Sequence, residues 1–119
     1  MTALTARGLP GLPEVRPGGD LAALIATALA GERLRDGQVL AIAHKAVSKS
    51  EGAVVALKDV QPSTRAHELA AAAAAAGASG ERNPRAIQVV LDESQELLRA
   101  ERGVLICRTR HGFICANAG

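Results

Sequence analysis

The stretch Gly103–Gly119, GVLICRTRHGFICANAG, decides the fold class that we expect for this chain. Two apolar runs with β-branched and aromatic residues flank Arg110-His111-Gly112, where glycine favours a turn. The pattern therefore predicts a strand, a turn and a second strand. A strand pair of this kind has an apolar face that must be covered, and helical patterns elsewhere in the chain can supply the cover.

The two cysteines lie symmetrically about His111, so Cys107 and Cys115 could face each other across the two strands. Their number and spacing match neither a disulfide-rich scaffold nor a zinc site. We expect two reduced, partly buried thiols.

Two helices are expected before this hairpin. The first begins at Pro62-Ser63 and runs through the alanine tract 70–76 to Gly77, because alanine has the highest helix propensity. After a connection over residues 77–82, Asn83-Pro84 combines a capping side chain with proline at the first helical position. One face of this second helix is expected to carry Ile87, Val90, Leu91, Ser94, Leu97 and Leu98.

The amino-terminal half begins with a loop over residues 8–19, which is rich in proline and glycine. Asp20 is placed to cap a helix that ends near Gly31. A turn at Asp36-Gly37 leads into the apolar run 39–43, which predicts a strand buried on both faces, and residues 53–57 predict another strand. The apolar positions of the expected helix are Leu21, Leu24, Ile25, Ala28 and Leu29.

This order of elements predicts a layered fold of mixed helix and sheet, α/β or α+β. At 119 residues we expect one domain, or part of one. Phe113 is the only aromatic residue, so the core must be built from smaller apolar side chains with less area to bury. Stability is therefore expected to be shared with a partner chain or with further sequence.

The charge pattern excludes some classes of function. The net charge is +2, acids and bases are interspersed, and aromatics that could stack on bases are nearly absent, which disfavours nucleic-acid binding. No apolar run has the length of a membrane span, and we expect a cytoplasmic protein.

Two of the three lysines lie in the stretch 43–52, AHKAVSKSEG, directly after the expected strand 39–43. Lysines and small hydroxyl residues after the carboxyl end of a buried strand are typical of phosphate-binding loops. The alternative is a pair of solvated lysines in an ordinary hairpin, since no Walker pattern is present. His44 could donate to the same phosphate or be a surface group.

Other small-residue segments could approach a ligand closely. Gly11, Leu12 and Pro13 lack bulk, and the string 117–119 either turns toward a site or ends a strand. His67 and His111 have no partner at metal-ligand spacing, so histidines predict no metal site.

The motifs in their order resemble a known family. Gly-Leu-Pro (11–13), Gly-Gly-Asp-Leu (18–21) and Asp-Gly-Gln-Val-Leu (36–40) precede His-Lys-Ala-Val-Ser-Lys-Ser-Glu-Gly (44–52). Leu-Asp-Glu-Ser-Gln-Glu-Leu-Leu-Arg and His-Gly-Phe-Ile-Cys-Ala-Asn-Ala-Gly follow. The series resembles the coenzyme F420:L-glutamate ligases, also called F420-0:γ-glutamyl ligases, over the first half or so of a family member.

The resemblance implies ligation of L-glutamate, through γ-linked amide bonds, to the coenzyme F420 precursor F420-0. It implies GTP as the energy source, an acyl phosphate intermediate, and a divalent metal, Mn²⁺ or Mg²⁺, with K⁺ as a further ion. It also implies an intertwined homodimer. The preference for GTP over ATP comes from the resemblance alone.

The resemblance also implies site residues. The GTP contacts fall on Gly11, Leu12, Pro13, Glu14, His44, Lys45 and Lys49, with Ser48, Asn117 and Gly119 near the site. No catalytic residue is assigned.

The chain departs from the family at its end. In the family an aliphatic residue and a metal-binding aspartate follow the Asn-Ala-Gly string, whereas this sequence stops at Gly119. Asp92, Glu93 and Glu96 are expected on a solvated helix face, so no metal ligand is assigned in this chain.

We therefore expect an amino-terminal portion of a ligase, incomplete on its own, and three alternatives stay open. The chain could act with a second polypeptide that supplies the metal site. It could instead be a non-catalytic nucleotide-binding or dimerisation module. The third alternative is a purely structural domain.

Overall fold

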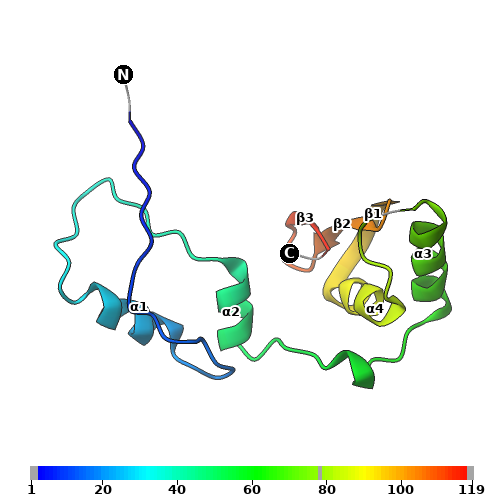
Figure 1. The fold of residues 1–119 in the computed structure, drawn as a ribbon, viewed down its shortest axis with the longest axis horizontal. Helices are drawn as coiled ribbons and strands as arrows, with labels where there is room; N and C mark the ends of the chain where they lie inside the picture. Colours follow the sequence, from blue (N-terminus) through cyan, green and yellow to red (C-terminus); the bar gives the residue numbers. More distant parts are fainter. Residues whose placement is uncertain (1–2, 78, 118–119) are drawn as a thin grey trace. The chain divides into compact units, whose positions relative to one another are not determined.

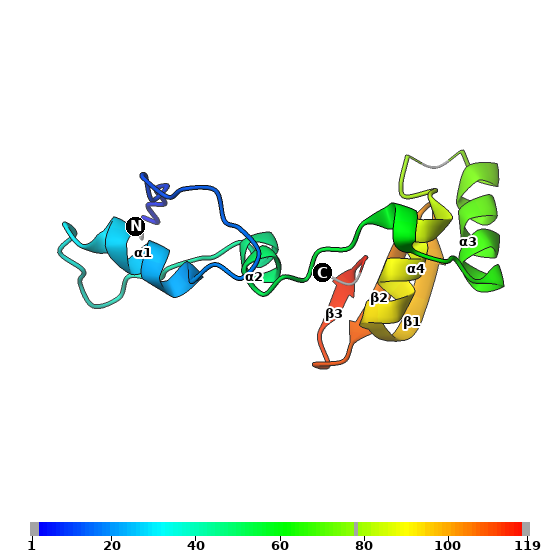
Figure 2. The same cartoon turned by 90° about the horizontal axis from the view of Figure 1, so that it is seen from below.

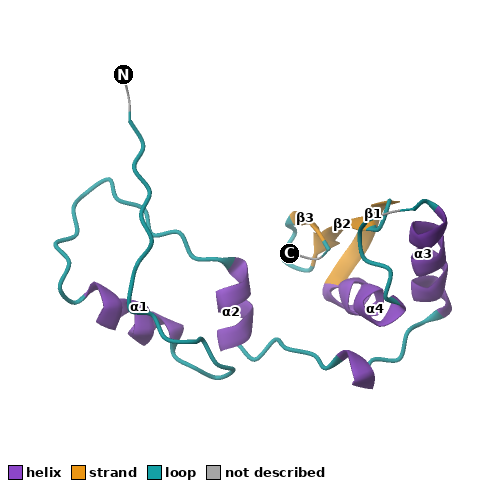
Figure 3. Cartoon of the chain, viewed as in Figure 1, coloured by secondary structure: helices purple, strands orange, loops and turns teal. Residues whose placement is uncertain are grey.

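The chain folds as two compact units, Met1–Val54 and Val55–Gly119, in a computed structural model that describes residues 3–77 and 79–117 (Figure 1). Each unit is described by itself. The first contains the helices α1 and α2, and the second contains all of the strands in the described residues (Figure 3). None of the described helices has the length and apolar content needed to cross a bilayer.

The second unit is an antiparallel sheet covered by helices. The strands β1 (Ser94–Glu101), β2 (Val104–Thr109) and β3 (Ile114–Ala116) lie in the order β1-β2-β3. Helix α4 (Pro84–Glu93) packs against β1, and α3 (Thr64–Ala75) packs against α4 (Figure 2). This mixture of helices and sheet agrees with the predicted α/β class.

The helices of this unit begin where the sequence predicts. The Ser63 hydroxyl accepts a hydrogen bond from the Ala66 amide at 3.2 Å, and the Asn83 side chain accepts one from Arg85 at 3.0 Å. The single-turn helix η1 (Leu57–Asp59) is held to α4, because the Arg85 guanidinium donates to the carbonyl of Lys58 at 3.0 Å. The core between the helices and the sheet consists of Ala66, Leu69, Ala70, Ile87, Leu105 and Cys107.

The predicted strand-turn-strand is confirmed as β2 and β3. Cys107 lies directly opposite Cys115 in the register, and both are free thiols, Cys107 buried and Cys115 half-buried. The β1–β2 hairpin turns at Arg102-Gly103, where φ is +52° and +75°. Positive φ at both central residues is typical of the tight two-residue turns that match the twist of the strands.

One helix prediction in this unit is wrong. The apolar face expected to continue through Leu97 and Leu98 ends with α4 at Glu93, and Ser94 begins β1. The Ser94 hydroxyl donates to the Val90 carbonyl at 2.5 Å, which satisfies an acceptor at the helix end. Leu97 reaches the core from the strand because it pairs with Cys107 on the covered face of the sheet.

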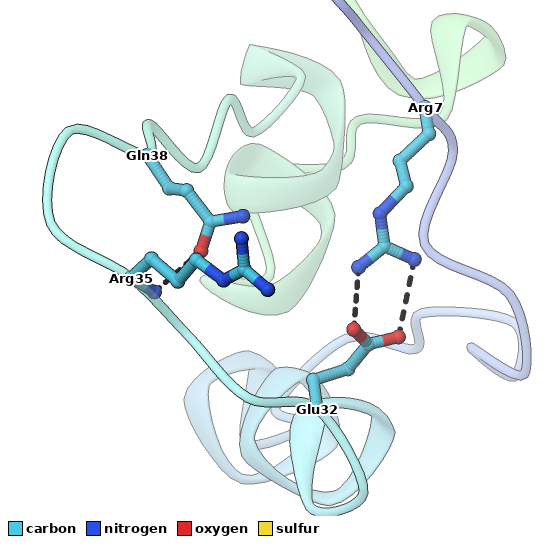
Figure 4. A network of polar contacts seen from close by, with 4 residues as sticks. All are labelled: Arg7, Glu32, Arg35 and Gln38. Carbon is cyan, nitrogen blue, oxygen red and sulfur yellow. Dashed lines mark hydrogen bonds and ion pairs between the residues drawn. The ribbon is translucent and has the colours of Figure 1, made fainter.

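The first unit has two helices joined by irregular chain. Helix α1 (Leu21–Leu29) begins as predicted, with the Asp20 carboxylate accepting from the Ala23 amide at 2.9 Å. The Arg7 guanidinium makes two hydrogen bonds to the Glu32 carboxylate, at 3.1 and 2.6 Å, and so ties the first residues to the chain that follows α1 (Figure 4).

Three further predictions, for residues 39–57, are wrong. Residues 39–43 and 53–57 form no strand, and most of the stretch AHKAVSKSEG is helix α2 (His44–Ser50) rather than a loop. A strand needs a neighbour for its backbone groups, and no described segment pairs with residues 39–43, whose Val39 is 90% exposed. The helix extends to Ser50, and Gly52, at φ +74°, donates to the Lys49 carbonyl at 3.0 Å.

Candidate functional site

Helix α2 sets Lys45 and Lys49 one turn apart on the same side of the helix, as residues four apart must lie. The loop from Leu12 to Val15 faces them, and together they line a pocket of about 350 Å³. Ala43 and Ala46 complete its wall, and their small side chains leave the space open. The loop is held in place where the Gly18 amide donates to the Ser50 carbonyl at 2.9 Å.

An ion pair crosses this pocket. The Lys49 ammonium donates to the Glu14 carboxylate, 35 residues away in sequence. The hydrogen bond from Lys49 and then its charge lower the pKa of Glu14, with smaller contributions from Lys45 and Arg16. The Lys49 side chain is 31% exposed and that of Glu14 is 74% exposed, so the pair lies at the mouth of the pocket.

The structure brings five of the seven predicted GTP contacts together. The pocket is lined by Leu12, Pro13, Glu14, Lys45 and Lys49. The two lysines were expected in a loop, but they lie on helix α2. Gly11 stands at the start of the loop, where its φ of +81° suits glycine and a side chain would meet open space. The same pocket also includes Val15, Ala43 and Ala46, which no sequence signal distinguished.

His44, Ser48 and Asn117 are not among the residues that line this pocket. His44 is exposed, and its ring Nε2 lies 3.3 Å from the Ser48 hydroxyl one turn along α2. Asn117 belongs to the second unit, where its amide oxygen accepts from the Leu105 backbone at 3.1 Å and its φ is +52°. Gly119 lies outside the described residues.

A divalent metal does not fit the residues of this chain that the structure describes. Among residues 3–77 and 79–117 there is no group of three or more His, Cys, Asp or Glu side chains that could hold one. Asp92, Glu93 and Glu96 are exposed, and Glu96 lies on β1 rather than on the expected helix, 3.4 Å from the Arg108 guanidinium. Their interpretation as solvated carboxylates is retained.

Comparison with known proteins identifies the family. Residues 11–119 match the family described as F420-0:Gamma-glutamyl ligase. The chain belongs to this ligase family. It is 39% identical over 114 residues to the coenzyme F420:L-glutamate ligase of Methanothermobacter thermautotrophicus, an alignment that covers 94% of this chain and 42% of that protein.

Two further F420:L-glutamate ligases give the same result. The protein of Methanopyrus kandleri is 42% identical over 106 residues, covering 89% of this chain and 38% of the relative. That of Halorubrum lacusprofundi is 45% identical over 113 residues, covering 93% and 42%. The chain thus spans about two fifths of the length of the curated ligases that it matches.

Proposed function

We propose that this chain is the nucleotide-binding portion of an enzyme that uses GTP to ligate L-glutamate, through γ-linked amide bonds, to the coenzyme F420 precursor F420-0. The observation that carries the proposal is the pocket in which Lys45 and Lys49 face the loop Leu12–Val15, in a chain of this family. Two ammonium groups one helical turn apart suit a chain of phosphates.

The proposed reaction needs charge neutralisation at those phosphates. A carboxylate oxygen of F420-0 attacks the γ-phosphorus of GTP, the bond to the bridging oxygen breaks, and GDP leaves. The glutamate amine then attacks the acyl carbon, loses a proton and expels inorganic phosphate. Lys45 and Lys49 are assigned to hold the triphosphate and to offset its charge while the γ-phosphoryl group transfers.

The metal and the glutamate and F420-0 sites are assigned to the part of the ligase that this chain does not span. A divalent ion bound there, Mn²⁺ or Mg²⁺ with K⁺ as a further ion, would supply positive charge at the phosphates. The step that the described residues support is therefore nucleotide binding.

We also propose that the active ligase is a homodimer. No residue in the described part of the first unit, residues 3–54, is buried, and α1, α2, Leu40 and Ile42 line a largely apolar groove of about 660 Å³. An apolar surface of this kind gains free energy when a second chain covers it.

The phosphate assignment is tested by titrating GTP into the 119-residue chain, with and without Mn²⁺, by isothermal calorimetry. Replacing Lys49 by alanine removes a charged donor, so Lys49→Ala should weaken GTP binding by about 10- to 100-fold. Mn²⁺ should add little, because the described residues contain no metal-binding group.

Lys58→Ala is the matched control. Lys58 is the third lysine of the chain, is exposed, and lies on η1 in the second unit, so its loss changes the net charge equally and should leave GTP affinity unchanged. Equal affinity of the parent and Lys49→Ala, or no GTP binding by a parent chain whose circular dichroism shows it folded, contradicts the assignment.

A further inference from the structure

The pocket proposed for the phosphates already contains an anion of its own. Glu14 is the one acidic residue among those that line it, and its carboxylate accepts a hydrogen bond from the Lys49 ammonium. A phosphate that approaches Lys49 must therefore take the ammonium from Glu14. Lys45 has no such partner among the described residues, so the two lysines are not equivalent.

We propose that Glu14 is an internal competitor of the nucleotide: its carboxylate pairs with Lys49 at the pocket and is displaced when a phosphate chain binds. This inference rests on the proposed function of the pocket. It assigns to Glu14 a role opposite to that of a nucleotide contact, because Glu14 opposes phosphate binding instead of supporting it.

The geometry allows the exchange at low cost. The Glu14 side chain is 74% exposed, on a loop with neither helix nor strand, so it can turn into solvent without breaking packed structure. Exposed ion pairs are weak, because water screens both charges. A triphosphate carries several negative charges, so it attracts the Lys49 ammonium more strongly than one carboxylate does. The same charges repel the Glu14 carboxylate.

The competition predicts that removing the charge of Glu14 tightens binding. We would titrate inorganic tripolyphosphate, which lacks the base and ribose, into the parent chain and into Glu14→Gln. The variant keeps the size of the side chain but cannot compete as an anion, so its affinity should rise about two- to fivefold. Glu93→Gln is the matched control, since Glu93 is exposed, lies on α4 in the second unit, lines neither pocket described above and makes the same change in net charge.

A second measurement follows Glu14 in the parent chain itself. Its carboxyl carbon can be titrated by NMR with and without saturating tripolyphosphate. Lys49 keeps the pKa of Glu14 low in the free chain, so transfer of the ammonium to the phosphate, together with the new negative charge nearby, should raise that pKa. If Glu14 stayed bound to Lys49 in the complex, its pKa would remain below the ordinary value.

The outcomes separate the two proposals. Tighter binding by Glu14→Gln, with Glu93→Gln like the parent and a raised Glu14 pKa in the complex, supports the competition. Binding that depends on Lys49 but is equal or weaker in Glu14→Gln overturns the competition and leaves the phosphate site standing. No tripolyphosphate binding by either the parent or Glu14→Gln overturns both.

Discussion

At the scale of single residues, the pair between Arg7 and Glu32 is the most fully formed polar contact of the first unit (Figure 4). Two parallel hydrogen bonds join residues 25 apart in sequence, the geometry in which a guanidinium and a carboxylate match best. The hydrogen bonds and the charge of Arg7 lower the pKa of Glu32. Both groups are exposed enough for water to screen their charges, so the pair adds little to the free energy of unfolding. The pKa of Glu32 is therefore the better measure of whether the contact forms.

Arg7→Ala should therefore return the pKa of Glu32 to its ordinary value, measured by NMR titration of the Glu32 carboxyl carbon. Because the folded-state pKa is lowered, the pair stabilises the fold above the pKa of the unfolded chain, and that contribution is lost as the pH falls through the lowered value. Arg33→Ala removes the same charge nearby and serves as the control. An unchanged Glu32 pKa in Arg7→Ala would mean that the pair does not form in solution.

At the scale of elements, the sequence located the starts of α1, α3 and α4 but missed α2 and β1. Asp20, Ser63 and Asn83 cap helices as predicted, because capping needs only a short side chain and the amides two or three residues on. The segment 94–98 was expected to continue the helix because Ser94, Leu97 and Leu98 keep the apolar spacing of the preceding turns, a pattern that favours a helix. Its pairing with β2 overrides that preference, and local pattern cannot report a tertiary contact.

The candidate site was also predictable only where its residues form a local pattern in the sequence. The concentration of lysine in residues 43–52 drew attention to Lys45 and Lys49, and the family resemblance added the loop 11–14. That α2 is helical was missed, because the apolar run before it suggested a strand. The meeting of Glu14 with Lys49 joins residues 35 apart, and no local signal encodes it.

The close approach of two glycines offers a test of the second unit. Gly103, in the β1–β2 turn, has φ +75°, and a Cβ there would lie 2.8 Å from the carbonyl carbon of Gly80. Gly103→Ala combines an unfavourable backbone conformation with a clash against main chain, so it should lower the free energy of unfolding by about 2–4 kcal/mol. Urea denaturation followed by circular dichroism measures the change.

Gly112→Ala is the control for backbone conformation alone. Gly112 lies in the β2–β3 connection at φ +86°, but a Cβ there meets open space. We expect a loss of roughly 1 kcal/mol. Equal losses for the two variants would show that the approach of Gly80 to Gly103 contributes nothing to stability.

At the scale of the whole chain, the two units differ in how much they bury. Every buried residue that the structure describes lies in the second unit, in α3, α4, β2 and Gly103. In the first unit Val39, Leu40 and Ile42 are exposed. The ion pairs that Glu14 and Glu32 form there are exposed, so they stabilise the fold too weakly to replace a core. Hydrophobic burial dominates folding stability, so we infer that the first unit depends for its stability on burial by a second copy or by further sequence of the ligase.

Hydrogen exchange at several protein concentrations tests this dependence together with the proposed homodimer. In dilute solution the amides of β2 should exchange at least about tenfold more slowly than those of α1, because α1 opens without disrupting a core. If a second copy covers the first unit, raising the concentration should slow exchange in α1 and leave β2 unchanged, while sedimentation shows a species of twice the 12.2 kDa chain mass. Exchange in α1 that stays fast and independent of concentration, with the single-chain mass throughout, would reject the homodimer for this chain. Strong protection of α1 in dilute solution would instead show that the first unit is stable without burial by a partner.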